Sequence, residues 1–353
     1  MPILSEGSKV LVSGANGYIG MWVVRLLLEQ GYSVRAVVRS EQKGDFLSQY
    51  FRPSGLVERL DFAYVTDFTK EGAFDDAVKD IDGVVHTASP FTLEAKNSND
   101  LMSPAIQGTV GILQSALKTG TQLKRIVITS SCGAVATPSP NPRKFSEEDW
   151  NIAAVEDFKK NGEKTAPMTI YRASKVLAEQ AAWDLYHQHK AQINWDLVVL
   201  HPPLVFGPPI NELKSPSSLN ASIAFWYDAV IRGDEMFSTK QGLSVSNSWV
   251  DVRDIALGHV LALQKQDAAG QRIIIAGGTF IWQEWLKAAN ALPQSPVQGK
   301  LQQGFPEIID ESSDRVIQVS YDISKERQIL GLKYKSRAET TKDTLEEFAK
   351  RGW

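Results

Sequence analysis

The segment Gly14-Ala15-Asn16-Gly17-Tyr18-Ile19-Gly20 decides the fold of this chain. It follows the short apolar run Val10 to Val12 and opens an amphipathic stretch, Tyr18 to Gln30, that ends at Gly31. A strand, a glycine-rich turn and a helix in this order let the backbone approach a pyrophosphate, and the free N–H groups at the helix N-terminus favour an anion. The spacing G-x-x-G-x-x-G is a variant of the usual dinucleotide fingerprint. The alternative interpretation is a tight turn that binds no ligand.

Beyond this segment, short apolar runs alternate with helix-length stretches as far as His201. The expected strands are Val10 to Val12, Val34 to Val38, Val84 to His86, Ile126 to Thr129 and Leu197 to Leu200. The longer expected helices are Tyr18 to Gln30, Asp100 to Lys118 and Met168 to His189. This alternation is typical of βαβ units around a parallel sheet that is buried on both faces. The predicted fold class is α/β, a doubly wound (Rossmann) parallel sheet with a smaller, discontinuous C-terminal substrate domain.

Two departures from the alternation suggest the domain organisation. Residues 137–167 begin with Pro138-Ser139-Pro140-Asn141-Pro142 and are expected to form a surface insertion with one helical turn near Ser146 to Trp150. After Leu204 the alternation lapses, although Ser336 to Arg351 again predicts an amphipathic helix. We expect residues 1–204 to form mainly the nucleotide-binding domain. Residues 205–353 should form mainly the substrate-binding region, with some segments returning to the first domain.

The composition excludes several classes of protein. The chain has 353 residues, of which 43% are hydrophobic and 22% charged, as in ordinary globular proteins. The net charge is −3, without the basic excess that nucleic-acid binding requires. The single Cys132 can form neither an intramolecular disulfide nor a cysteine-based zinc site, and no secretory signal or apolar membrane span is visible. We expect a cytoplasmic protein without metal, nucleic-acid or membrane partners.

Two cations after the second expected strand indicate the type of nucleotide. A protein that binds NAD usually has an acidic residue here to bind the adenosine ribose, whereas a 2′-phosphate needs a cation. This strand ends with Arg39, and Lys43 follows at the start of the next helix. The charges therefore favour NADP(H) over NAD. The alternative is that both residues are ordinary solvated cations.

A third group of residues suggests proton-transfer chemistry. Tyr171 and Lys175 stand four residues apart in an expected helix, so their side chains share one face. The lysine is expected to lower the pKa of the tyrosine. Thr129-Ser130-Ser131 stands at the C-terminal end of the expected strand Ile126 to Thr129, where a doubly wound sheet binds its ligands. We predict that Ser131 polarises a carbonyl group, Tyr171 transfers the proton, and Lys175 tunes Tyr171 and holds a ribose. Ser130 is the alternative to Ser131.

Together these motifs resemble those of the extended short-chain dehydrogenases/reductases. The segments Val12 to Gly20, His86-Thr87-Ala88-Ser89-Pro90-Phe91 and Val205-Phe206-Gly207-Pro208 are similar to those of fungal methylglyoxal, aldehyde and ketone reductases. These are relatives of the plant dihydroflavonol and cinnamoyl-CoA reductases.

The resemblance also implies roles for individual residues. The glycines Gly14, Gly17 and Gly20 would bind the pyrophosphate, with Tyr18 and Ile19 covering it. The other implied cofactor contacts are Arg39 and Lys43 at the 2′-phosphate, Asp67 and Phe68 at the adenine, Thr87, Ala88, Ser89 and Thr129 along the cofactor, and Pro202 and Val205 at the nicotinamide. Phe91 would face the substrate, together with Ser131 and Tyr171.

The function predicted from these residues is NADPH-dependent reduction of an aldehyde or ketone to an alcohol. The predicted partner is a small carbonyl compound, and the protein is expected to be a monomer or a homodimer. One alternative is a nucleotide-sugar epimerase or dehydratase that holds NAD tightly, against which Arg39 argues. A second is a non-enzymatic NADP-sensing protein, against which the intact Ser, Tyr and Lys set argues.

Overall fold

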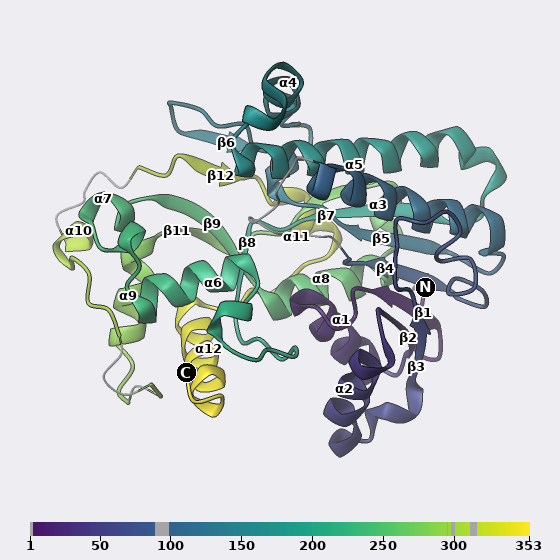
Figure 1. Ribbon diagram of the computed structural model, residues 1–353, viewed down its shortest axis with the longest axis horizontal. Coiled ribbons are helices and arrows are strands. Elements are labelled where there is room, and N and C mark those ends of the chain that lie inside the picture. The colour runs from purple at the N-terminus through teal and green to yellow at the C-terminus, as the bar shows by residue number, and fades with distance from the viewer. Residues whose placement is uncertain (1–2, 89–98, 295, 298–300, 311–315) are drawn as a thin grey trace.

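The centre of the computed structural model is a seven-stranded parallel sheet with the order β10-β7-β5-β4-β1-β2-β3 (Figure 1). Its strands are β1 (Lys9–Ser13), β2 (Ser33–Val38), β3 (Leu60–Tyr64), β4 (Gly83–His86), β5 (Arg125–Thr129), β7 (Asp196–His201) and β10 (Arg272–Ile274). The structure describes residues 3–88, 99–294, 296–297, 301–310 and 316–353. The strand order reverses direction between β1 and β4, as in a doubly wound sheet. The predicted α/β fold is confirmed.

Helices cover both faces of this sheet. The main ones are α1 (Tyr18–Glu29), α2 (Glu41–Phe51), α3 (Asn99–Thr119), α5 (Pro167–His189) and α8 (Val252–Gln264). Alternate residues of β1 serve opposite faces: Val10 and Val12 share a buried cluster with residues of α1 and α8, whereas Leu11 packs with residues of α3 and α5. Both faces of the strand are therefore apolar, which explains its unbroken hydrophobic run.

The predicted helix ends agree closely with the observed ones. Gly31 follows α1 with φ +84°, a left-handed conformation that glycine adopts without strain. Helices α3 and α5 begin and end within one residue of their predicted limits. The predicted C-terminal helix is α12 (Arg337–Lys350), which Ser336 and Glu339 begin with a reciprocal capping box.

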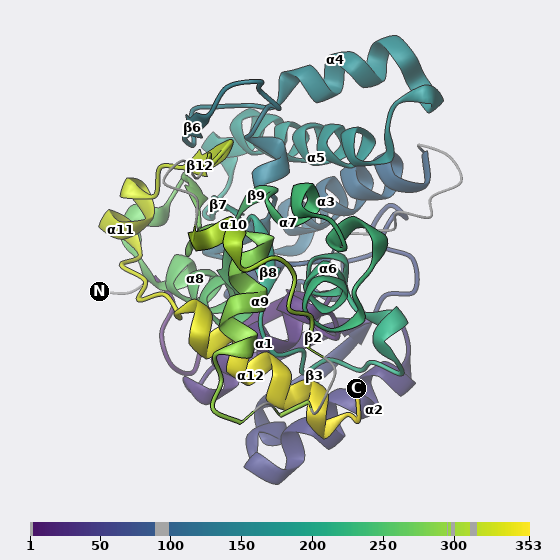
Figure 2. The same cartoon turned by 90° about the vertical axis from the view of Figure 1, so that its left-hand side faces the viewer.

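The C-terminal half builds a second lobe beside the carboxyl ends of the sheet strands (Figure 1). A three-stranded sheet contains β8 (Leu204–Phe206), β9 (Ser246–Asp251) and β11 (Gly278–Ile281). Around it lie α6 (Ala221–Tyr227), α7 (Lys240–Leu243), α9 (Trp282–Asn290) and α10 (Glu307–Asp310), whereas α11 (Ser324–Ile329) contacts β10 of the main sheet. Helix α12 packs against α9 (Figure 2). Strand β10 and helix α8 return to the main sheet, so the chain crosses between the lobes more than once.

The insertion at residues 137–167 has more regular structure than expected. It contains β6 (Arg143–Phe145), which pairs in parallel with β12 (Val319–Tyr321), and the helix α4 (Ile152–Asn161). Near the helical turn predicted at Ser146 to Trp150 the structure has a single hydrogen-bonded turn, in which the Asp149 N–H donates to the Ser146 carbonyl at 3.1 Å, and this turn is separate from α4. The helix starts later because the Asn151 side chain accepts a hydrogen bond from the Ala154 N–H and caps it.

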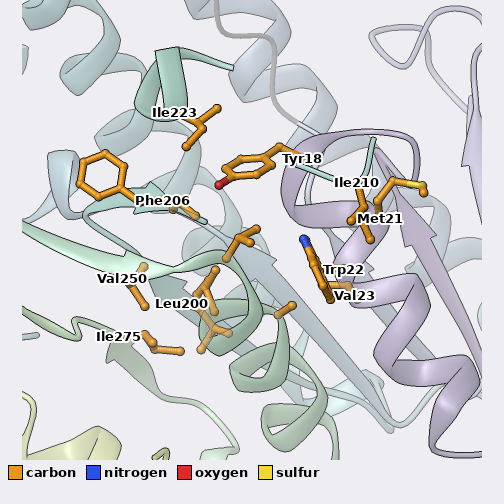
Figure 3. Close-up of a cluster of buried hydrophobic side chains, with 14 of the residues drawn as sticks. Tyr18, Met21, Trp22, Val23, Leu200, Phe206, Ile210, Ile223, Val250 and Ile275 are labelled. Atoms are coloured by element: carbon orange, nitrogen blue, oxygen red, sulfur yellow. The ribbon is translucent and has the colours of Figure 1, made fainter. Parts of the chain in front are cut away.

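Two aromatic side chains of α1 join the lobes. The Tyr18 hydroxyl donates to the carbonyl of Gly207 at 2.7 Å, and the Trp22 indole N–H donates to the carbonyl of Pro208 at 2.9 Å. The two residues are one helical turn apart, and Figure 3 shows them reaching from α1 toward the segment that carries Phe206 and Ile210. They hold the segment after β8 against the glycine-rich turn.

Among the described residues, no helix has the length and apolar character needed to cross a membrane.

A buried carboxylate holds the chain that leads into α12. Asp254, on α8, is 4% exposed and accepts a hydrogen bond from the Lys335 N–H at 2.8 Å. Burial, with a smaller contribution from the Asp251 charge, raises the pKa of this carboxyl to about 7 against the lowering by the Lys335 hydrogen bond. An acid whose folded pKa lies above its unfolded pKa of about 3.9 destabilises the folded protein as pH rises between the two values.

Asp254→Asn should therefore stabilise the protein, because the amide oxygen can still accept from Lys335 and no charge is buried. We expect a gain of about 1 to 4 kcal/mol above pH 7, at about 1.4 kcal/mol per pKa unit, that shrinks toward zero near pH 4. Urea denaturation across this pH range measures it. Asp76→Asn, whose side chain is 94% exposed, is the control and should show little pH-dependent gain. An equal gain at every pH would contradict the assignment to Asp254.

Candidate active site

A cavity of about 890 Å³ lies at the carboxyl ends of β1, β4, β5 and β7 and extends into the second lobe. The predicted site residues that line it are Gly14, Gly17, Tyr18, Ile19, Gly20, Arg39, Lys43, Phe68, Thr87, Ala88, Thr129, Ser131, Tyr171, Lys175, Pro202 and Val205. Ser89 and Phe91 lie outside the described residues. The fold thus brings into one cavity residues that are far apart in the sequence.

The glycine-rich turn depends on missing side chains. Gly14 has φ +65°, and a Cβ atom there would lie 2.9 Å from the backbone of Ala88. A Cβ on Gly20 would lie only 2.1 Å from the Gly14 carbonyl oxygen. Helix α1 begins at this point and has no acidic residue in its first turn. The backbone cradle and the positive end of the helix dipole fit a pyrophosphate. The Tyr18 hydroxyl is bound to Gly207, so this residue joins the lobes as well as lining the cavity.

Cations lie at the end of the cavity next to β2. Arg39 is exposed, and its guanidinium carbon lies 5.7 Å from the centroid of the Phe68 ring. Lys43 forms an ion pair of 2.6 Å with Glu212, a residue that the sequence interpretation missed. The Asp67 carboxylate accepts hydrogen bonds from the backbone and hydroxyl of Thr69, and these bonds lower its pKa. It therefore shapes the turn beside Phe68.

Two threonines that line the cavity are held by hydrogen bonds from their hydroxyl groups to neighbouring elements. The Thr87 hydroxyl donates to the Ser13 carbonyl at 2.7 Å, which joins the ends of β4 and β1. The Thr129 hydroxyl lies 2.6 Å from Nε2 of His259, whose Nδ1 lies 2.7 Å from the Ile255 carbonyl. Burial lowers the pKa of His259 to about 4, so the ring is neutral. Its Nδ1 must then carry the hydrogen, and Nε2 accepts from Thr129.

The structure separates the two serine candidates. Ser131 is hydrogen-bonded to Tyr171, and its Oγ accepts from the Gly133 N–H at 3.0 Å. The Ser130 hydroxyl instead donates to the buried Glu179 at 2.6 Å, although Ser130 also lines the cavity. The geometry therefore groups Ser131 with Tyr171 and Lys175, whose ammonium lies 5.9 Å from the centroid of the Tyr171 ring.

The pKa of Tyr171 differs from the prediction. Burial raises it, and this effect exceeds the lowering by the Ser131 hydrogen bond and the nearby Arg172 charge. Burial also lowers the pKa of the Lys175 ammonium to about 8, opposed by Glu179. The prediction that the lysine lowers the tyrosine pKa was wrong, because it considered the charge pair without the loss of water around it. Tyr171 is therefore protonated near neutral pH.

Sequence interpretation missed a buried ion network behind these residues. The Glu179 side chain is 1% exposed and contacts His201 at 2.8 Å and Arg272 at 2.7 Å, besides Ser130. Arg272 also stacks on Trp150, 3.7 Å from its ring centroid. The spacing in the sequence could have indicated Glu179, because it follows Lys175 by four residues and therefore lies on the same helix face.

Cys132 contributes no nucleophile. Its thiol is buried and donates to the His201 carbonyl at 3.2 Å. Burial raises the pKa of the thiol well above its usual value, so the thiolate is not formed near neutral pH.

Glu179→Gln should destabilise the protein strongly, because it leaves the Arg272 guanidinium, 11% exposed, without its carboxylate. We expect a loss of about 3 to 5 kcal/mol of unfolding free energy. The control is Glu346→Gln, which breaks a surface pair with Lys342 and should cost less than about 1 kcal/mol. Urea denaturation measures the unfolding free energy of both variants. Equal losses would show that the buried network stabilises the protein no more than a surface ion pair does.

Comparisons with known proteins agree with this geometry. The ketoreductase azaE of Aspergillus niger is 33% identical, with 94% of each chain covered. The NADPH-dependent methylglyoxal reductase of Saccharomyces cerevisiae is 32% identical, covering 97% of this chain and 98% of the relative. A crystal structure of the yeast methylglyoxal/isovaleraldehyde reductase Gre2 complexed with NADPH superposes with a TM-score of 0.83 at 30% identity, covering 98% of this chain and 99% of the other.

The family assignment follows from these likenesses and from a profile match. The model of the NAD dependent epimerase/dehydratase family matches residues 10–277, which include the glycine-rich turn, Ser131, Tyr171 and Lys175. The chain belongs to this family of extended short-chain dehydrogenases/reductases, as its motifs predicted.

Proposed function

We propose that this protein is an NADPH-dependent reductase that converts an aldehyde or ketone to an alcohol. The observation that carries the proposal is the grouping of Ser131, Tyr171 and Lys175 in the same cavity as the cations Arg39 and Lys43. The names of the two relatives, a ketoreductase and an NADPH-dependent methylglyoxal reductase, support it.

We assign each part of the cofactor to a group of residues in or beside the cavity. Gly14, Gly17 and Gly20 would hold the pyrophosphate. The remaining cofactor residues would be Tyr18 and Ile19 near the pyrophosphate, Arg39 and Lys43 at the 2′-phosphate, Asp67 and Phe68 near the adenine, Thr87, Ala88 and Thr129 along the wall, Lys175 at the ribose, and Pro202 and Val205 at the nicotinamide. When bound, the reduced nicotinamide supplies a hydride to the carbonyl carbon.

The protein's own residues handle the carbonyl oxygen. The Ser131 oxygen accepts from the Gly133 N–H, and the hydroxyl, which is hydrogen-bonded to Tyr171, would turn its hydrogen toward a bound carbonyl oxygen. Tyr171 is protonated near neutral pH and can donate its proton to the same oxygen. Lys175 would hold the ribose and stabilise the phenolate that remains.

We assign the substrate side mainly to residues 205–353, with residues 1–204 as the cofactor side. The second lobe supplies apolar lining residues, including Phe225, Met236 and Trp282. Arg39 in place of an acid favours NADPH over the NAD that an epimerase or dehydratase would hold, and the complete Ser, Tyr and Lys set favours an enzyme over an NADP sensor.

Tyr171→Phe removes only the hydroxyl, so it should lower kcat by about 100- to 10,000-fold while NADPH binding stays nearly intact. Single-turnover reduction and fluorescence titration of the cofactor measure the two effects. The control is Tyr64→Phe, at a residue 51% exposed and outside the cavity lining. Ser131→Ala should also lower kcat, and Ser130→Ala should be milder. A folded Tyr171→Phe protein that turns over at the parental rate would remove the proton-donor role.

Arg39→Asp should erode or reverse a preference for NADPH over NADH, because it removes a charge-assisted contact with the 2′-phosphate and adds repulsion. Arg39→Gln, which only removes the charge, should have a smaller effect. The ratio of kcat/KM for the two cofactors is the measurement, and each tenfold change corresponds to about 1.4 kcal/mol. Equal use of both cofactors by the unmodified protein would overturn the NADPH assignment.

A further inference from the structure

The charges lining the cavity are of one sign. Among its described lining residues, the ionic side chains are Arg39, Lys43, Arg172 and Lys175, with no aspartate or glutamate. Arg39, Lys43 and Lys175 have roles in the proposed cofactor site. Arg172 has no role in the proposed cofactor site. A substrate molecule in the part of the cavity that the cofactor leaves free would lie near its positive charge.

Arg172 lies at the end of the cavity where the reaction would occur. It follows Tyr171 in α5, and its stem passes Gly133, where an added Cβ atom would lie 3.5 Å from the Arg172 Cγ. The same Cβ would lie 3.2 Å from the Ser131 oxygen. Because Gly133 has no side chain, Arg172, Tyr171 and Ser131 can all lie close to it and to one another. The guanidinium also lowers the pKa of both Tyr171 and Tyr321, so its charge lies near both phenols.

Arg172 differs from the other enclosed arginines. Arg125 is paired with Asp196, Arg253 with Asp251 and Asp343, and Arg272 with Glu179. Arg172 is partly buried, but no carboxylate in the described part of the chain forms an ion pair with it. No nitrogen of Arg172 is among the described polar atoms that are buried without a partner, so its guanidinium faces the cavity, where an anionic ligand could pair with it.

We propose that the substrate carries a carboxylate within a few bonds of its carbonyl group, and that Arg172 binds this carboxylate. A planar guanidinium matches a carboxylate through two parallel hydrogen bonds, which would orient the neighbouring carbonyl toward Ser131 and Tyr171. The substrate class is therefore the keto acids, including acids that carry an aldehyde. This inference rests on the proposed carbonyl reduction and names the substrate class of the same site.

The test compares each acid with its own neutral ester. Two pairs vary the distance between the groups: benzoylformate and its methyl ester, and benzoylpropionate and its methyl ester. NADPH consumption gives kcat and KM for the parent protein, Arg172→Met and Arg172→Lys. Arg232→Met is the control, because Arg232 is 58% exposed, pairs with Asp228 and Asp234, and does not line the cavity.

We expect the parent to prefer the acid of at least one pair. Arg172→Met should lower kcat/KM for that acid by about 10- to 100-fold, mainly through KM, and change the ester less than about threefold. Arg172→Lys should retain part of the preference, and Arg232→Met should retain all of it.

Two outcomes would overturn the inference alone. One is a parent protein that reduces the esters at least as well as the acids. The other is an Arg172→Met variant that loses activity equally on both, which would mean that Arg172 acts through Tyr171 or the fold. A parent that is folded and binds NADPH but reduces no carbonyl compound would overturn the proposed function, and the inference with it.

Discussion

The contact between Gly20 and the Gly14 carbonyl oxygen is the constraint on which the rest of the site depends. No side chain fits there, because even a methyl carbon would lie 2.1 Å from that oxygen. The close approach fixes where α1 starts relative to β1. It also fixes where Tyr18 and Trp22 reach the segment after β8. One backbone contact therefore sets both the anion cradle and the position of the second lobe that closes the cavity.

Helix α5 organises the other half of the site. Its residues Tyr171, Lys175 and Glu179 are spaced by four, so one face runs from the cavity into the buried interior. Glu179 is held there by His201 and Arg272, which come from two neighbouring strands of the main sheet, β7 and β10. The strand order therefore determines the position of α5 through ion pairs as well as through apolar packing.

The sequence predicts features that depend on local pattern. The parallel sheet, the glycine-rich turn and the ends of α1, α3 and α5 follow from hydrophobic period and glycine placement, both of which act within a few residues. Contacts between distant segments could not be predicted in this way. Glu212 reaches Lys43 from 169 residues away, and β6 pairs with a strand near residue 320. The polar start of the insertion gave no sign of that pairing, because β6 has three residues and only Phe145 is buried.

The pKa shifts show why burial has to be weighed together with charge. Burial raises the pKa of Tyr171 and lowers that of Lys175, so it favours the neutral form of both groups. For Tyr171 this is the form that a reductase needs, since the phenol must hold the proton that it donates. For Lys175 the same effect works against the charge that would stabilise the resulting phenolate. The negative charge of Glu179, one helical turn further on, opposes it and favours the ammonium. The buried network thus supports the lysine charge on which the proposed proton transfer from Tyr171 would depend.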